Sequence, residues 1–517
     1  MIRKSVILAL MASALGAFVP QEASASSWLR AESAHFVIYS DVGQGNTRDY
    51  LRQLEAFKYL TDLLLGVNPN AAAANSKFTI YLFDDQDLLK VVRPTFGRYI
   101  GGVYMHCVEG AEVFANRPTQ WRSDDDPGLI VLQHEYVHHV MFSRMQRFYP
   151  MWYVEGFADY LSTVMLNHGA LTIGSSSKER VATLDSDRSW MDFRIILDPA
   201  KFAEASRNRK VEVFHFYAQS WLLTHYMQAD TQRTEAFNDY FERIGRGEDG
   251  VASFEAATHI HVDQLSSVLR IYLRNLKALR VPVPDLPSST AQITPLSGER
   301  SEYLLKAAVL QTCPDREYGE KLTGELRAMQ ARHAKDNDYR IELDRAELLF
   351  GNVGVARADL EKIAAEGEHS FELHYLLGRA YYQVAQQSLA QPQTLMTEAA
   401  GQFLAAYELN KLDPANLYFL SKTLDDGGTG VPPKAVINSS FSATLLAPSI
   451  PEYAFNAAAI SLRAGNPDQA VRAVRPFASD PHNQQQAAQV AAMIVAIKEG
   501  KDLQEVMATV EGSHRDP

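Results

Sequence analysis

Two histidines and a glutamate have the spacing of a metal site. Residues 134–138 read H-E-Y-V-H. Positions i and i+4 of a helix lie on one face, so His134 and His138 can reach the same metal ion. Glu135 lies about 100° further round the helix, which keeps its carboxylate off the metal but near a water held there. The pattern predicts one Zn²⁺ per chain, with both histidines as ligands and Glu135 as the general base.

An acidic pair, Glu155 and Asp159, follows at helical spacing. Glu155 comes 17 positions after His138, which leaves room for a turn and an antiparallel helix over 152–160. A carboxylate from that helix would complete a His₂Glu ligand set and leave the fourth position to water. Asp159 lies on the same face as Glu155 and would then hold the second ring nitrogen of a ligand histidine.

Two helices must position these side chains. For the first, Asp126 can act as N-cap and Pro127 suits the first turn. The residues that follow give the helix a broad apolar surface, which is typical of a buried helix. Pro150 lies beyond its end, and the second helix is expected to begin directly after it.

The segments H-E-Y-V-H-H and W-Y-V-E-G-F-A-D-Y together resemble the gluzincin metallopeptidases and, more narrowly, bacterial peptidase-MA-like domains. The resemblance implies an α+β metallopeptidase domain in which His134, His138 and Glu155 bind zinc and Glu135 is the base. It also implies that Asp159 supports a ligand histidine. The interval between His138 and Glu155 is slightly shorter than in the best-known gluzincins, and Asp159 is the alternative third ligand.

The same resemblance implies two further parts of the site. Gluzincins stabilise the oxyanion with a tyrosine or histidine from a downstream helix, here expected over 213–228. Tyr217 and His215 are the candidates, and the run Y-A-Q-S-W favours Tyr217. An upstream edge strand, either 101–104 or 112–115, would pair with the substrate backbone.

The region before the metal helix alternates between strand and helix patterns. Strands are expected over 35–40, 78–83, 99–105 and 112–116, with a turn at 109–110. Leucines and a phenylalanine at helical spacing predict a helix over 47–65. After the second metal helix, 170–174 and 181–184 are expected to form a hairpin, and helices continue to about residue 279.

The N-terminal 25 residues have the features of a secretory signal peptide. Arg3 and Lys4 precede a mostly apolar run over 5–19, and the small-x-small triplet 23–25 suits a cleavage site. No other apolar run is long enough to span a bilayer. We therefore expect an exported protein, periplasmic or secreted, with no membrane span in the mature chain.

The chain is predicted to contain two domains. Residues 26–280 would form the metallopeptidase-like domain and the Pro/Ser-rich stretch 281–300 a linker. Residues 301–517 would form an all-α domain whose small/large alternation resembles degenerate tetratricopeptide (TPR) repeats. Interruptions are expected near residue 391 and over the Gly/Pro-rich stretch 427–451. Such stacks often bind a protein partner on a concave face.

The net charge and the cysteine count limit the classes of function and site that the sequence allows. A formal charge of −12 without basic clusters argues against nucleic-acid binding. Cys107 and Cys313 could pair in an oxidising compartment, although two unpaired buried thiols are the favoured expectation. The sequence thus predicts a zinc metallopeptidase that hydrolyses a peptide or protein substrate through a zinc-activated water. The alternative is a periplasmic TPR adaptor with a vestigial metallopeptidase domain.

Overall fold

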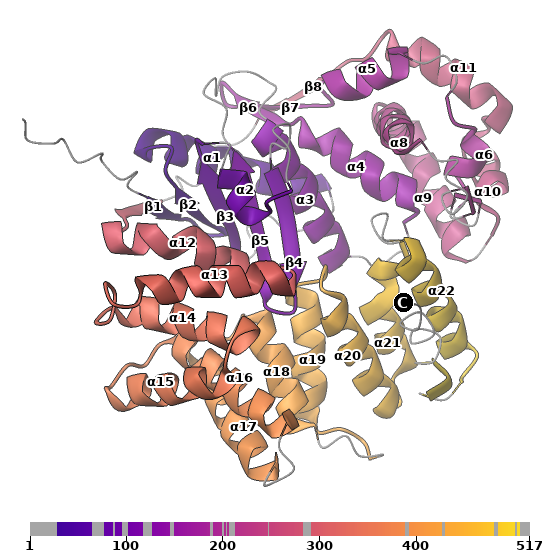
Figure 1. Cartoon of the computed structure of the whole chain (residues 1–517). Coiled ribbons are helices and arrows are strands. Elements are labelled where there is room, and N and C mark those ends of the chain that lie inside the picture. The colour runs from indigo at the N-terminus through magenta and orange to yellow at the C-terminus, as the bar shows by residue number, and fades with distance from the viewer. Residues whose placement is uncertain are drawn as a thin grey trace, which may run out of the picture.

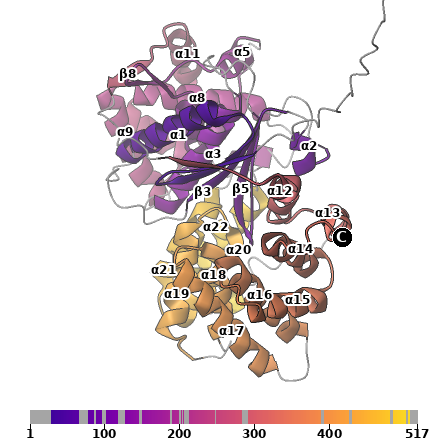
Figure 2. The same ribbon diagram turned by 90° about the vertical axis from the view of Figure 1, so that its left-hand side faces the viewer.

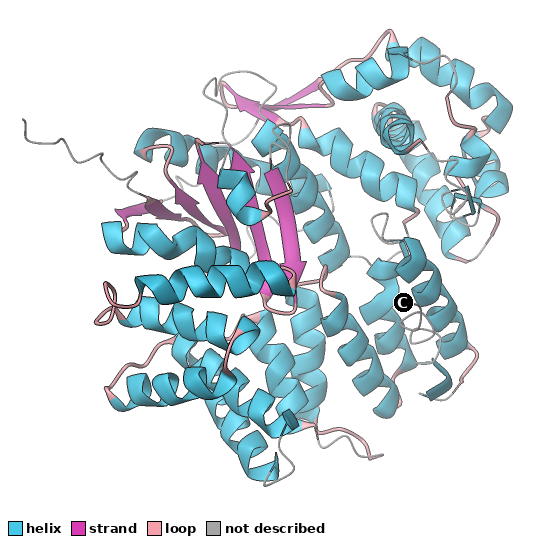
Figure 3. Ribbon diagram, viewed as in Figure 1, coloured by secondary structure: helices cyan, strands magenta, loops and turns pink. Residues whose placement is uncertain are grey.

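The computed structural model describes most of the chain after its N-terminal segment. The described residues are 28–64, 77–85, 88–95, 102–116, 127–144, 149–186, 190–198, 201–202, 204–205, 212–246, 248–282, 291–387, 392–425, 430–479, 484–501 and 504–506. The predicted signal peptide and the predicted cap Asp126 lie outside these ranges. The described part is mixed α and β, with a small sheet near its start followed mostly by helices (Figures 1 and 3).

A six-stranded mixed sheet forms the centre of the N-terminal part, with strand order β4-β5-β3-β2-β1-β9. Its strands are β1 (Leu29–Glu32), β2 (Phe36–Ser40), β3 (Phe78–Phe83), β4 (Gly102–Cys107), β5 (Gly110–Asn116) and β9 (Gln292–Pro295). The four predicted strands are confirmed as far as the structure describes them, since residues 99–101 of the predicted strand 99–105 lie outside the described residues, whereas β1 and β9 were not predicted. β2, β3 and β5 run parallel, and the other pairs are antiparallel.

One face of this sheet is covered by α1 (Gln44–Leu64) and α3 (Pro127–Arg144), as Figure 2 shows. Strand alternation sends Phe36, Ile80 and Val113 to this face, where they join the largest buried apolar cluster. α3 lies against β4 and β5. The helix that carries His134 and His138 is therefore held on the sheet, next to its β4 edge.

A helical layer follows α3 in the chain. α4 (Met151–Ser162) packs against both α3 and α8 (Val213–Gln228), and α9 (Thr231–Gly245) packs against α10 (Gly250–Thr258). α6 (Phe193–Ile196) contacts α11 (Val262–Leu273), which also reaches α8. The predictions of α1, α3, α4 and α8 are confirmed. The helices of this layer end with α11 at Leu273, somewhat before the predicted end near residue 279, and β8 (Leu279–Pro282) follows.

The predicted hairpin after α4 is only half right. β7 (Ala170–Ile173) is a strand, but it pairs with β6 (Met165–Asn167) and with β8 in a three-stranded sheet. Residues 181–184 belong to α5 (Lys178–Ser186). Ser177 explains the difference, because its side chain accepts a hydrogen bond from the Arg180 N–H and starts a helix there.

The C-terminal part is an array of helices that lies below the sheet in Figure 1. Its elements are α12 (Gly298–Leu310), α13 (Arg316–Met329), α14 (Asn337–Phe350), α15 (Val353–Ala365), α16 (Phe371–Gln387), α17 (Pro392–Leu409), α18 (Pro414–Leu424), α19 (Lys434–Leu446), α20 (Pro451–Arg463), α21 (Pro467–Val474), the 3₁₀ helix η2 (Arg475–Ser479) and α22 (Gln484–Lys498). From α12 to α22 each α-helix packs against the next. The short α2 (Leu89–Val92) touches α12.

One predicted interruption of this array is wrong. Much of the Gly/Pro-rich stretch 427–451 is occupied by α19, which packs between α18 and α20. Residues 388–391, at the other predicted interruption, lie outside the described residues. The predicted linker 281–300 contains β9, which pairs with β1 and returns the chain to the sheet before α12.

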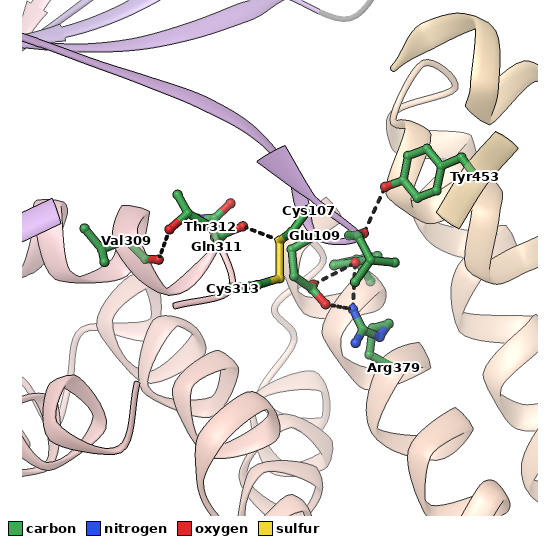
Figure 4. Close-up of a disulfide and its surroundings, with 10 residues drawn as sticks. Cys107, Glu109, Val309, Gln311, Thr312, Cys313, Arg379 and Tyr453 are labelled. Atoms are coloured by element: carbon green, nitrogen blue, oxygen red, sulfur yellow. Dashed lines mark hydrogen bonds and ion pairs between the residues drawn. A yellow bond between two sulfur atoms is a disulfide. The ribbon is translucent and has the colours of Figure 1, made fainter. Parts of the chain in front are cut away.

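The hairpin formed by β4 and β5 anchors the sheet to the helical array (Figure 4). Cys107 and Cys313 form a disulfide, with their Cα atoms 6.1 Å apart, so the favoured expectation of free thiols is wrong. At the tip, Glu109 pairs with Arg379 of α16, and the Val108 carbonyl accepts a hydrogen bond from Tyr453 of α20 at 2.9 Å. The second face of the sheet packs on α12, α13 and α14 through a separate apolar cluster.

Within the part of the chain that the structure describes, every helix is too short or too polar to cross a lipid bilayer.

Candidate metal centre

α3 and α4 bring the predicted ligands together. His138 and Glu155 are buried, with 6% and 0% of their surfaces exposed, and His134 is largely covered. The close approach of α4 to α8 depends on Gly156, where a Cβ atom would lie 2.3 Å from the Ser220 carbonyl oxygen. A glycine next to Glu155 therefore lets α8 pack directly against α4, the helix that carries this candidate ligand.

Three ligand atoms form a triangle of the size that zinc requires. The Nε2 atoms of His134 and His138 are 3.0 Å apart. Glu155 places one carboxylate oxygen 3.2 Å from Nε2 of His134 and the other 3.6 Å from Nε2 of His138. Ligands 2.0–2.1 Å from a tetrahedral zinc ion are separated by about 3.3 Å. The donor set and the spacing therefore both fit zinc, and the alternative ligand Asp159 is not needed to complete it.

Asp159 instead contacts the back of His134. Its Oδ1 lies 3.1 Å from Nδ1 of His134, so Nδ1–H can donate to the carboxylate and leave the Nε2 lone pair facing the triangle. Arg180 of α5 fixes Asp159 by donating from Nε to Oδ2 at 2.8 Å and from Nη2 to Oδ1 at 3.2 Å. The sequence reasoning missed Arg180, and the N-cap serine at 177 was the available signal that its segment is helical.

The electrostatics of the site favour a cation. Burial alone would lower the pKa of His134, but Asp159 and Glu155 raise it well above its ordinary value. Burial would likewise raise the pKa of Glu155, yet the two imidazoles hold it below its usual range. The two carboxylates that stabilise a proton on His134 would also stabilise a metal ion at the same position.

Tyr217 lies close enough to Glu135 and to the ligand carboxylates to interact with their charges. Burial raises the pKa of Tyr217, and the charges of Glu155, Asp159 and Glu135 raise it further, so all three carboxylates act on its hydroxyl. The Arg180 guanidinium carbon lies 5.3 Å from the Tyr217 ring centroid. His215 is two positions earlier on α8, about 200° round the helix, and therefore points away when Tyr217 faces the site.

Of the two candidate edge strands, only one lies at an edge. β4 is an outer strand of the sheet, whereas β5, which contains residues 112–115, is paired on both sides. Tyr104 on β4 is influenced by the charge of Glu135 and lies 2.7 Å, oxygen to oxygen, from the Ser449 hydroxyl in the α19–α20 turn. The helical array thus reaches the strand that borders the candidate site.

Comparison with known proteins adds one finding. A family described as "Protein of unknown function (DUF1570)" matches residues 130–248. No curated protein matches the chain. The matched segment begins inside α3 and ends just after α9, so it contains the three ligand candidates together with Glu135, Asp159, Arg180 and Tyr217.

Proposed function

We propose that the protein is a zinc-dependent metallopeptidase that hydrolyses peptide bonds. The observation that carries the proposal is the convergence of His134, His138 and Glu155 within one zinc-sized triangle, with Glu135 adjacent on the same helix. Two neutral imidazole nitrogens and one carboxylate are a common ligand set of catalytic zinc, in which a fourth position stays open.

Glu135 and Tyr217 would have different roles in hydrolysis. When bound, zinc supplies a positive charge that acidifies a water and polarises a carbonyl group. Glu135 accepts the proton of the attacking water and passes it to the leaving amine. Tyr217 donates its hydroxyl hydrogen to the oxyanion of the tetrahedral intermediate, and its raised pKa keeps that hydrogen in place at neutral pH.

The environment of the site supports a peptide as the substrate. β4 has a free edge on its outer side within the described sheet, and α3 lies beside it. An extended peptide can add to such an edge through main-chain hydrogen bonds. In a gluzincin-like arrangement, β4 would bind the substrate in this way. The proposal also includes a TPR-like helical array that binds a protein partner.

Export is also part of the proposal. The Cys107–Cys313 disulfide supports it, because disulfides persist in oxidising compartments such as the periplasm and are rare in the cytosol. The predicted signal peptide at residues 1–25 is consistent with the same location.

Two substitutions test the proposal when metal content and peptide turnover are measured together. Glu135→Gln should retain about one zinc per chain and lose at least 100-fold in turnover, because it removes only the proton acceptor. His134→Ala should lose both zinc and turnover. Casein and a peptide library serve as substrates.

His139→Gln is the matched control, because it removes a histidine from α3 that packs on Phe78 and not on the triangle. It should retain both metal and turnover. Full turnover by Glu135→Gln would contradict the mechanism. Zinc binding without hydrolysis of any peptide by the wild-type protein would favour the alternative, an adaptor with a vestigial metallopeptidase domain.

A further inference from the structure

A second candidate site lies on the other face of the sheet. A cavity of about 420 Å³ lies between strands β2, β3 and β5 and helices α12, α14, α16 and α18, and it extends to Tyr104 of β4 and His139 of α3. Its volume falls within the range of small-molecule sites, which often lie where two structural units meet. None of the three candidate metal ligands lines this cavity, although His139 of α3, next to His138 in the chain, lies at its border.

The cavity is lined by more carboxylates than its neighbouring cations neutralise. The acidic lining residues are Glu109, Glu112, Glu342, Glu372 and Asp413. Arg379 binds Glu109, which also accepts a hydrogen bond from the Tyr375 hydroxyl at 3.0 Å. A single guanidinium, that of Arg345, donates hydrogen bonds to both Glu342 and Glu372.

The other lining cations are engaged elsewhere. Arg30 and Lys77 both pair with Glu32, and Arg300 pairs with Asp338. The side chains of Arg30, Lys77 and Arg300 are all more than one-third exposed. The charge of Arg300 also interacts with Tyr39 and Glu342. None of these pairs places a positive charge on Glu112.

Glu112 is the carboxylate that lacks a partner. Only 9% of its surface is exposed, and its Oε2 atom has no hydrogen-bond partner among the described residues. It lies on β5, and strand alternation places it on the face shared with Phe114, which points toward the helical array. Burial raises the pKa of Glu112 to about 8, and that of Asp413 to about 7. At neutral pH such a buried carboxyl group holds its proton, and a positively charged ligand beside it would favour the ionised form, so that binding is coupled to release of that proton.

Aromatic side chains also line the cavity. Tyr39 and Tyr81 stack with their ring centroids 5.2 Å apart and both line the cavity, as does Tyr303. Aromatic faces beside carboxylates recognise organic cations, because the ring quadrupole attracts the charge while the ring packs on the carbon body. The lining therefore combines apolar and anionic contacts.

A bare metal ion fits the cavity less well. Among the described residues, the groups of three close enough to hold a metal are His134–His138–Glu155 and Glu299–His333–Asp336. Neither group lines this cavity. Its carboxylates are spread over four elements, which suits a ligand with some length.

We propose that this cavity binds a compact organic cation carrying an ammonium or guanidinium group, with the charge beside Glu112 and the carbon body against Tyr39 and Tyr81. The ligand is either a free amine or the basic side chain of a peptide, since both present the same chemistry. The proposal does not depend on peptidase activity.

Calorimetric titration of the full chain tests this with two probes, putrescine as a free diamine and N-acetyl-lysine methylamide as a peptide side chain. At least one should bind with a Kd below about 1 mM, and the tighter of the two identifies the source. Glu112→Gln should weaken that binding at least tenfold, because it keeps the shape of the side chain and removes the group that can ionise beside the cation. The uncharged 1,4-butanediol should not bind.

Glu325→Gln is the matched control, since this glutamate of α13 is part-exposed and pairs with surface lysines; it should bind as the wild type does. Tyr39→Leu provides an independent variant should Glu112→Gln fail to fold, and it should also weaken binding. No binding of either probe to the wild-type chain, or unchanged affinity in both cavity variants, would overturn the proposal.

Discussion

At the scale of single residues, the candidate site depends on how Asp159 holds His134. Replacing the carboxylate by an amide removes a charge-assisted hydrogen bond to Nδ1 and leaves Arg180 without its buried partner. Asp159→Asn should weaken zinc affinity about 10–100-fold, measured by competition with a chelator. Asp185→Asn, which changes an exposed carboxylate of α5, should leave the affinity unaltered. Equal affinities for the two variants would show that Asp159 does not position His134.

Asp344 is expected to make the free energy of unfolding depend on pH. Asp344 of α14 is 3% exposed, and burial, with a smaller effect of Asp359, raises its pKa to about 9. The unfolded chain releases this proton near pH 4 and the folded chain only near pH 9. The folded state is therefore destabilised as pH rises through that interval, and the loss is complete above it.

The Asp344→Asn variant has no ionisable group at this position. Its folded state should therefore not lose stability as the pH rises through this interval. Urea denaturation should show the variant more stable than the wild type by a few kcal/mol at pH 8, with the difference shrinking toward pH 4. A difference that stays constant between these pH values would contradict the raised pKa of Asp344.

Residue chemistry also decides what the sequence could reveal about the site. His134, Glu135 and His138 lie within one helical turn, so their relative placement follows from helix geometry alone. The prediction of Glu155 as the third ligand required only one turn and an antiparallel helix after α3, together with a family resemblance. Arg180 lies on a separate helix, and no spacing rule connects it to Asp159.

At the scale of elements, the packing of α4 on α8 holds the helix that carries Glu155 in place. A methyl group at position 156 would collide with the backbone of Ser220, which cannot move without displacing α8. Gly156→Ala should cost about 1–3 kcal/mol in chemical denaturation and reduce zinc affinity, because Glu155 moves with the strained helix.

Gly324→Ala is the matched control for this substitution. Position 324 lies inside α13 with no atom near the added methyl group, so alanine should stabilise the helix by roughly 0.5–1 kcal/mol. Similar effects at positions 156 and 324 would show that the α4–α8 contact does not need a glycine.

Elements with strong local signals were predicted correctly, and those decided by tertiary contacts were not. α1, α3 and α8 have the apolar content and length of buried helices. In contrast, α19 is rich in serine and β-branched residues and follows two prolines, and its packing between α18 and α20 outweighs that weak propensity. β9 has four residues and exists through its pairing with β1.

At the scale of the whole molecule, the β4–β5 hairpin joins the sheet to the helical array. The Cys107–Cys313 disulfide links positions 206 residues apart in sequence, which is why spacing could not reveal it. Removing a crosslink that closes so long a loop should destabilise the protein by about 2–5 kcal/mol. Urea denaturation with and without a reductant measures this loss.

The double variant Cys107→Ser/Cys313→Ser is the control. Its denaturation curve should coincide with that of the reduced wild type and should not respond to reductant. A wild-type curve that is unchanged by reductant would show that the disulfide contributes nothing to the attachment of the array.

The most direct test of the central claim is anomalous X-ray scattering at the zinc edge from crystals of the wild-type protein. The account predicts one peak per chain, bounded by Nε2 of His134, Nε2 of His138 and the Glu155 carboxylate at about 2.0–2.2 Å. A peak elsewhere, or no peak between these three side chains, would contradict it.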